Sequence, residues 1–205
     1  MKNIKIINKV DINEDGLVST IGYENKNHKI FLRQGDMDAA CGLYCTFMSL
    51  LICGLISRES ITGMAFSDDK KIKNLWKEFS DYSPLIKEGT TSKKLSEAIN
   101  IAFGEKIEFK KKRLQYNKCP QNKKVLDAIK DEILSDNPII IGVNWSKDSG
   151  HWVIVTGIEY TISNNGNYNI NKIFILDPLR NEPKLSYWNQ MILVSQNQLG
   201  YKCVV

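Results

Sequence analysis

Histidine is scarce in this sequence, with only two residues, His28 and His151, in a chain of 205. Cysteine is sparse too, and the five cysteines lack the dense, regular spacing of a secreted disulfide scaffold. No Cys-x-x-Cys pair occurs, and two histidines far apart in the sequence offer little to a zinc ion. The sequence therefore predicts free thiols in a reducing compartment, with neither a metal nor a cofactor.

Long apolar runs are also missing. No stretch approaches the ~20 apolar residues of a membrane-spanning helix, and the first residues do not open the apolar core of a signal peptide. The most apolar window, residues 43–56, is short and interrupted by small polar residues, which favours a buried core helix. We expect a cytoplasmic protein with no membrane partner; export as an effector by a route that needs no signal stays open.

Neither sign of charge dominates, because 28 basic and 23 acidic residues leave a net charge of +5. A hydrophobic content of 42% with 25% charged residues is typical of a globular protein. The length fits a single domain over residues 1–205. The most basic run, residues 110–113, has no nucleic-acid motif beside it and is interpreted as a solvated strand end, so no nucleic-acid partner is expected.

Residues 1–30 are expected to form an N-terminal hairpin or arm. Short strands are predicted at residues 5–7 and 17–21, on either side of the turn signal Asn13-Glu14-Asp15-Gly16. His28 follows in a polar segment and is predicted to lie in a solvated loop.

Helical periodicity governs the middle of the chain. Apolar residues recur at helical spacing over residues 72–79, 95–102 and 125–133. The cap-like Thr90-Thr91-Ser92 precedes the second of these helices, and Asn137-Pro138 ends the third. None of the three helices carries a group of residues suited to catalysis, so their apolar faces are predicted to pack in the core.

Extended structure is predicted after Pro138. The β-rich runs span residues 139–143, 152–158 and 172–176. The last two are joined through residues 164–167, whose asparagine and glycine content suits a hairpin turn, so they should pair antiparallel. His151 opens one strand of this pair and Asp177 closes the other. Because the start of one antiparallel strand lies beside the end of the next, we expect the imidazole and the carboxylate to meet.

Cys41 stands at the predicted start of the apolar helix, where unpaired backbone amides and the positive end of the helix dipole favour a thiolate. A thiol attacks a carbonyl carbon as the thiolate, so an imidazole must take its proton and a third group must orient that imidazole. Cys41, His151 and Asp177 supply the nucleophile, the base and the orienting group of a cysteine peptidase.

These residues resemble a known family. Cys41-Gly42-x-x-Cys45 opens an apolar helix, Gly89-Thr90-Thr91 precedes another, and Asp177-Pro178 closes a strand. This pattern is similar to the bacterial double-glycine leader peptidases, the papain-like cysteine peptidase domains usually joined to bacteriocin exporters. The resemblance covers roughly residues 33–194.

The resemblance implies an α+β, papain-like fold in which an N-terminal helical part carries Cys41 and a C-terminal antiparallel sheet carries His151 and Asp177. It also implies that Gln34, upstream of the nucleophile, helps the Cys41 amide to stabilise the oxyanion. The exporters' membrane helices and the Gly-x-x-x-x-Gly-Lys-Ser/Thr phosphate loop are not found in the sequence. We therefore expect a stand-alone enzyme and leave its substrate open.

Three functions stay open at this point. The first is a cysteine peptidase that cleaves a protein or peptide substrate. The second is a protein-glutamine deamidase or an acyltransferase, which would use the same thiol, base and oxyanion donors on a different amide. The third is a peptide-binding module without turnover. A partner protein encoded nearby and the oligomeric state are also left open.

Overall fold

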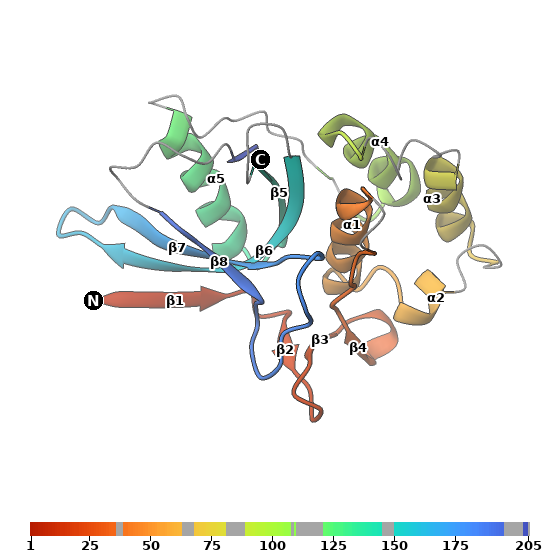
Figure 1. The fold of residues 1–205 in the computed structure, drawn as a ribbon, viewed down its shortest axis with the longest axis horizontal. Coiled ribbons are helices and arrows are strands. Elements are labelled where there is room, and N and C mark those ends of the chain that lie inside the picture. The colour runs from red at the N-terminus through yellow and green to blue at the C-terminus, as the bar shows by residue number, and fades with distance from the viewer. Residues whose placement is uncertain are drawn as a thin grey trace.

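The computed structural model describes residues 1–35, 39–62, 68–80, 89–107, 109, 121–144, 150–194 and 203–204. Within these residues the fold is α+β, with helices α1 to α4 at one side and an antiparallel sheet, covered by α5, at the other (Figure 1). The helices are α1 (Cys41–Ile52), α2 (Arg58–Thr62), α3 (Lys70–Ser80), α4 (Ser92–Phe103) and α5 (Gln121–Leu134), with a 3-10 turn η1 (Tyr23–Asn25). The strands are β1 (Lys2–Ile6), β2 (Asp11–Ile12), β3 (Val18–Ile21), β4 (Asn27–Lys29), β5 (Ile139–Asn144), β6 (Gly150–Ile162), β7 (Tyr168–Leu176), β8 (Gln190–Leu193) and β9 (Cys203–Val204).

Strand β6 is the centre of the main sheet, whose order is β8-β7-β6-β5-β9. The first half of β6 pairs with β5, its second half pairs with β1, and β7 lies along its other edge. The predicted hairpin between β6 and β7 is confirmed: the Ser163 N–H donates to Asn167 O at 2.9 Å, and Gly166 supplies a φ of +74° in the turn. Antiparallel pairing thus brings the start of β6 to the end of β7.

The N-terminal segment differs from the expected hairpin in its strand partners. The predicted turn is present, but the strands that flank it are β2 and β3, which form a small sheet with β4. Strand β1 instead pairs antiparallel with β6, with Ile4 opposite Glu159. Strand β1 pairs with a free edge of β6, which lies more than a hundred residues further along the chain. The local sequence pattern therefore could not predict the partner of β1.

His28 corrects a second expectation, because it is buried on β4 and not in a solvated loop; its exposed fraction is 5%. Its Nε2 lies 3.1 Å from Tyr23 O, and its Nδ1 lies 3.9 Å from a carboxylate oxygen of Glu59 on α2. The polar residues at 24–27 are exposed, at the turn η1 and the start of β4, whereas His28 pairs with Thr20 on β3 and is buried.

The three predicted helices are confirmed as α3, α4 and α5. Thr91 caps α4, since its hydroxyl oxygen accepts from the Lys94 N–H at 3.3 Å. The short helix α2 was not predicted. The basic run at 110–113 lies outside the described residues. No helix of the described part of the chain has both the length and the apolar character that crossing a membrane requires.

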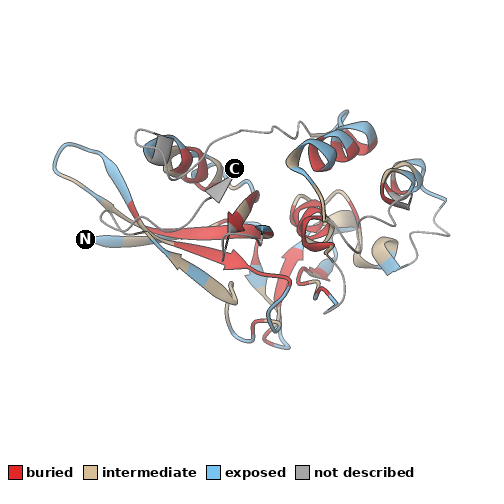
Figure 2. Ribbon diagram, turned by 45° about the horizontal axis from the view of Figure 1, so that its top comes forward, coloured by how far each residue is buried: buried red, intermediate tan, exposed pale blue. Residues whose placement is uncertain are grey.

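Helix α1 is shared between two hydrophobic cores, as the buried colouring of Figure 2 shows where helices and sheet meet. On one face, Cys45, Met48 and Ile52 pack with the sheet and α5. On the other, residues such as Leu50 and Leu51 pack with α3 and α4. A helix that is apolar on all sides is buried on all sides, which confirms the predicted core helix. The start of α1 is therefore held firmly against β6.

Candidate active site

Cys41 is the first residue of α1, as predicted, and is 7% exposed. The N-cap residue, Ala40, makes no side-chain capping hydrogen bond. The first N–H groups of a helix have no acceptor in the preceding turn, and an alanine has no side-chain oxygen with which to cap them. A sulfur at this end of the helix also lies near the positive end of the dipole. The start of α1 is thus suited to hold negative charge.

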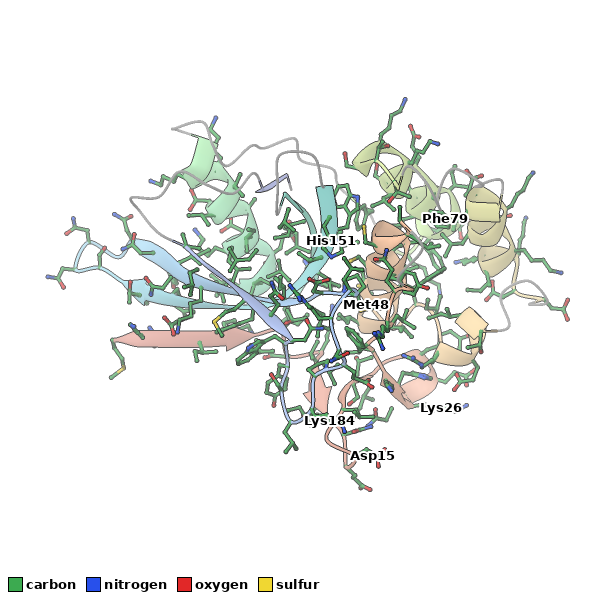
Figure 3. All side chains as sticks on the ribbon, viewed as in Figure 1. Asp15, Lys26, Met48, Phe79, His151 and Lys184 are labelled. Atoms are coloured by element: carbon green, nitrogen blue, oxygen red, sulfur yellow. The ribbon has the colours of Figure 1, made fainter. Side chains whose placement is uncertain are left out.

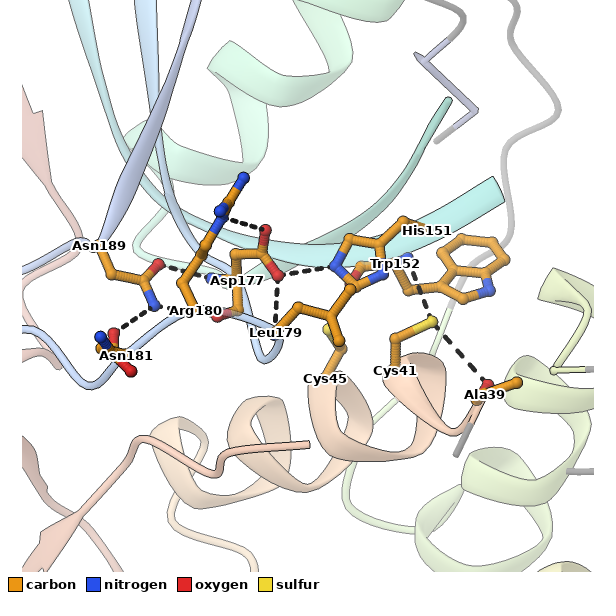
Figure 4. A network of polar contacts seen from close by, with 10 residues as sticks. All are labelled: Ala39, Cys41, Cys45, His151, Trp152, Asp177, Leu179, Arg180, Asn181 and Asn189. Atoms are coloured by element: carbon orange, nitrogen blue, oxygen red, sulfur yellow. Dashed lines mark hydrogen bonds and ion pairs between the residues drawn. The ribbon is translucent and has the colours of Figure 1, made fainter. Parts of the chain in front are cut away.

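His151, the second residue of β6, lies between α1 and the sheet (Figure 3). Its Nε2 is 2.7 Å from Oδ1 of Asp177, which directly follows β7, and both side chains are buried. The Cys41 sulfur also acts on this imidazole, and its presence raises the pKa of His151. Since Nε2 is engaged by Asp177, the nitrogen left for the sulfur is Nδ1. The structure therefore brings together three residues that the sequence predicted to meet (Figure 4).

Asp177 is fixed by a network that the sequence analysis missed. The Leu179 N–H donates to the same Oδ1 at 2.9 Å. Asn189 brackets the Asp177 backbone: its Oδ1 accepts from the Asp177 N–H at 2.7 Å, and its Nδ2 donates to the Asp177 carbonyl at 2.9 Å. Arg180 Nε lies 3.9 Å from Oδ2, on a side chain that is largely exposed. No local sequence pattern marks Asn189, because it lies twelve residues after Asp177 and only the folded chain brings the two together.

The protonation of His151 follows from these contacts. Burial by itself lowers the pKa of His151, but the hydrogen bond to Asp177, the nearby Cys41 sulfur and the negative charge of both groups outweigh it and raise the pKa to about 9. The imidazole therefore stays protonated at pH values well above 6.5, the ordinary pKa of histidine. A positive imidazole beside a sulfur is the charge state that a thiolate nucleophile needs.

The Cys41 sulfur has a second donor in the backbone of β6, because the Trp152 N–H points at Sγ at 3.4 Å. The sulfur also lies 4.0 Å from the carbonyl of Ala39. One helical turn further on, the buried Cys45 thiol donates to the Trp152 carbonyl at 3.3 Å. The Trp152 indole N–H donates to Thr90 O at 2.9 Å. Cys45 is thus fully buried and still makes a polar contact, which no local sequence pattern predicted.

Gln34, the predicted oxyanion donor, is buried in the segment before α1. Its backbone N–H donates to the carbonyl of Pro178 at 2.9 Å. This bond ties the Gln34 backbone to the residue that follows Asp177. The role of its side chain on an oxyanion stays a prediction.

Gly42 permits a close approach between α1 and the loop before α4. A Cβ at this position would overlap Thr90 Oγ1 and would lie 3.1 Å from both Leu95 and Trp152. We expect Gly42→Ala to lower the free energy of unfolding by about 1–3 kcal/mol, because the overlap pushes α1 away from Thr90. Urea unfolding measures this loss.

The matched variants for this prediction use Thr90, whose Oγ1 is buried and has no hydrogen-bond partner among the described residues. Thr90→Ala alone should change stability little, whereas adding it to Gly42→Ala should recover part of the loss because the overlapping oxygen is gone. A double variant no more stable than Gly42→Ala would show that the overlap is not the cause.

Comparison of the chain with protein-family models, with curated proteins and with solved structures gives no match. In the described part of the chain, no group of three or more His, Cys, Asp or Glu side chains is placed to hold a metal ion. The three cysteines whose side chains are described, Cys41, Cys45 and Cys53, are free thiols. Interpretation of the site therefore depends on its own geometry.

Proposed function

We propose that this protein is a thiol-dependent hydrolase that cleaves a peptide bond of a protein or peptide substrate. The observation that carries the proposal is the placement of His151 between the Cys41 sulfur and the Asp177 carboxylate. An imidazole that is hydrogen-bonded to a carboxylate and lies near a thiol is the arrangement of a cysteine nucleophile with its base. A structural cysteine needs no such partner.

The proposed fold is papain-like. Two features support it: Cys41 starts a buried helix of the helical part, and the other two residues lie at adjacent ends of two antiparallel strands, His151 in β6 and Asp177 directly after β7. The chain order of nucleophile, histidine and aspartate is that of papain-like enzymes, as expected from the resemblance of the sequence to the double-glycine leader peptidases.

The proposed reaction begins from the Cys41 thiolate and the His151 imidazolium. The thiolate attacks the substrate carbonyl carbon, and the tetrahedral oxyanion accepts hydrogen bonds from the Cys41 N–H and the Gln34 side chain. His151 then gives its proton to the leaving amine, which leaves a thioester on Cys41. Water then attacks the thioester as it gives a proton to His151, and the Cys41 thiolate leaves. The carboxylic acid that is released loses its proton to solvent, and the thiolate–imidazolium pair is restored.

The experiment that tests this function compares wild type with Cys41→Ala in a bacterial lysate. New peptide termini are read by mass spectrometry, together with glutamines converted to glutamate. We expect new termini with wild type only. Deamidated glutamine without new termini would replace the peptidase by a deamidase of the same chemistry. Identical peptides from both proteins, with no acyl group trapped on Cys41, would overturn the proposal in favour of a binding module.

A further inference from the structure

The start of β6 extends past the end of its neighbour β7. Pairing between the two strands begins at Ile154 opposite Leu176, and Asp177 then leaves the sheet. Trp152 lies two residues before this first pair, with Gly142 of β5 opposite it on the other side. The edge of β6 that faces β7 therefore carries backbone groups that β7 does not reach.

The two cysteines of α1 take the place of the missing strand at this edge. The Trp152 N–H is directed to the Cys41 sulfur at 3.4 Å, and the Trp152 carbonyl accepts from the Cys45 thiol at 3.3 Å. Residues four apart on a helix lie on one face, so the two sulfurs of α1 match the N–H and C=O of a single residue. Figure 4 shows both sulfurs directed from α1 toward β6.

The two thiols have opposite hydrogen-bonding roles. A carbonyl oxygen only accepts, so Cys45 has to keep its proton to make its bond. A backbone N–H only donates, so Cys41 accepts, and it accepts best as a thiolate. The contact to Trp152 thus distinguishes the two cysteines: the sulfur of Cys41 receives a hydrogen bond, whereas Cys45 must keep its proton to give one.

We infer that Cys45 is a positioning residue, whose S–H bond to the Trp152 carbonyl holds the Trp152 N–H on the Cys41 sulfur. This inference rests on the proposed function, since it assigns the support of the same nucleophile. Cys45 does not touch the reacting carbon. It acts through Trp152, by fixing the distance between the first turn of α1 and β6.

The surroundings of Cys45 agree with a permanently protonated thiol. Burial raises the pKa of Cys45 well above its ordinary value of 9.0, and negative charge on Cys41 and Asp177 acts in the same direction. Among the described residues, the charged groups that act on Cys45 are Cys41 from α1 and Asp177 from the end of β7. Of the positive groups beside Asp177, His151 is bonded to its Oδ1 at 2.7 Å, and Arg180 Nε lies 3.9 Å from its Oδ2 on a largely exposed side chain.

The test measures how fast iodoacetamide alkylates Cys41 as a function of pH, by mass spectrometry of its peptide, in folded full-length protein. Cys45→Ser keeps a donor, whereas Cys45→Ala and Cys45→Val both remove it and differ in volume. We expect both donor-free variants to alkylate Cys41 roughly tenfold more slowly near pH 6, with the profile moved to higher pH, because the thiolate loses a fixed N–H donor. Cys45→Ser should restore most of the rate.

Cys53→Ala is the matched control, since Cys53 lies at the other end of α1 and its removal should leave the profile unchanged. A profile unchanged in Cys45→Ala and Cys45→Val, even with a lower melting temperature, would overturn the positioning role. The positioning role would also be overturned if the pH profile of Cys41 alkylation moved as far in Cys45→Ser as in Cys45→Val. If wild-type Cys41 reacted near pH 6 no faster than Cys53, the proposed function itself would fail, which separates the two outcomes.

Discussion

Replacing Cys41 by alanine is expected to abolish turnover, with a loss of at least about 10⁴-fold in kcat, because the covalent intermediate has no other atom on which to form. Cys41→Ser should be nearly as inactive. A serine hydroxyl at this site would have to lose its proton to an imidazole whose pKa the hydrogen bond to Asp177 raises, so that the imidazole accepts a proton poorly at neutral pH. Cleavage of a peptide identified in the lysate experiment gives the rate constants for each variant.

Cys53→Ala is again the matched control, because this thiol is partly buried at the end of α1 and touches no member of the triad in the described contacts. It should retain full activity. Cys41→Ala also removes little buried volume, so its melting temperature should stay close to that of wild type. Residual turnover of more than a few per cent in a folded Cys41→Ala protein would show that another residue is the nucleophile.

The meeting of the three site residues was predictable from the sequence because each lies at a defined point of a regular element. Cys41 starts an apolar helix, and His151 and Asp177 lie at matching ends of an antiparallel hairpin whose turn is marked by asparagine and glycine. The geometry of such a hairpin fixes which ends are adjacent. Local signals were therefore sufficient to bring the imidazole and the carboxylate together.

The supporting residues were not predictable in this way, because their contacts depend on tertiary packing. Asn189 reaches the Asp177 backbone from the far side of a loop. Cys45 has the sequence environment of any small core residue, and only the early end of β7 exposes the Trp152 carbonyl to it. Likewise, His28 is buried by its strand partner Thr20, although its sequence neighbours are polar.

The two-sided burial of α1 connects the fold to the chemistry. Active sites require their groups to be held within a fraction of an ångström, and rigid elements do this better than loops. Cys41 lies at the end of a helix that two cores hold in place, and His151 lies on the central strand of the sheet. The site thus forms where a helix that is buried on two sides meets the central strand of the sheet.

Removing the Asp177 side chain is expected to cost on the order of 10³- to 10⁴-fold in kcat/KM, the magnitude found when the orienting group of a triad is lost. Asp177→Ala takes away the acceptor for His151 Nε2 and also leaves the Leu179 N–H without its partner. The imidazole then has no fixed orientation toward the sulfur. Steady-state kinetics on a cleaved peptide measures the loss, and circular dichroism checks that the variant is folded.

Asp177→Asn separates orientation from charge, because the amide oxygen can still accept from His151 Nε2 and from the Leu179 N–H. We expect a smaller loss of activity and a lower pKa of His151, so the alkaline limb of kcat/KM should move from near pH 9 toward pH 6.5.

The same raised pKa stabilises the folded protein fully below about pH 6.5, and that contribution disappears as the pH rises through about 9. The free energy of unfolding of wild type, measured with urea, should therefore fall between these pH values, and that of Asp177→Asn should fall by less. An alkaline limb that stays near pH 9 in Asp177→Asn would mean that Asp177 does not set the charge of His151, and the triad would have to be abandoned.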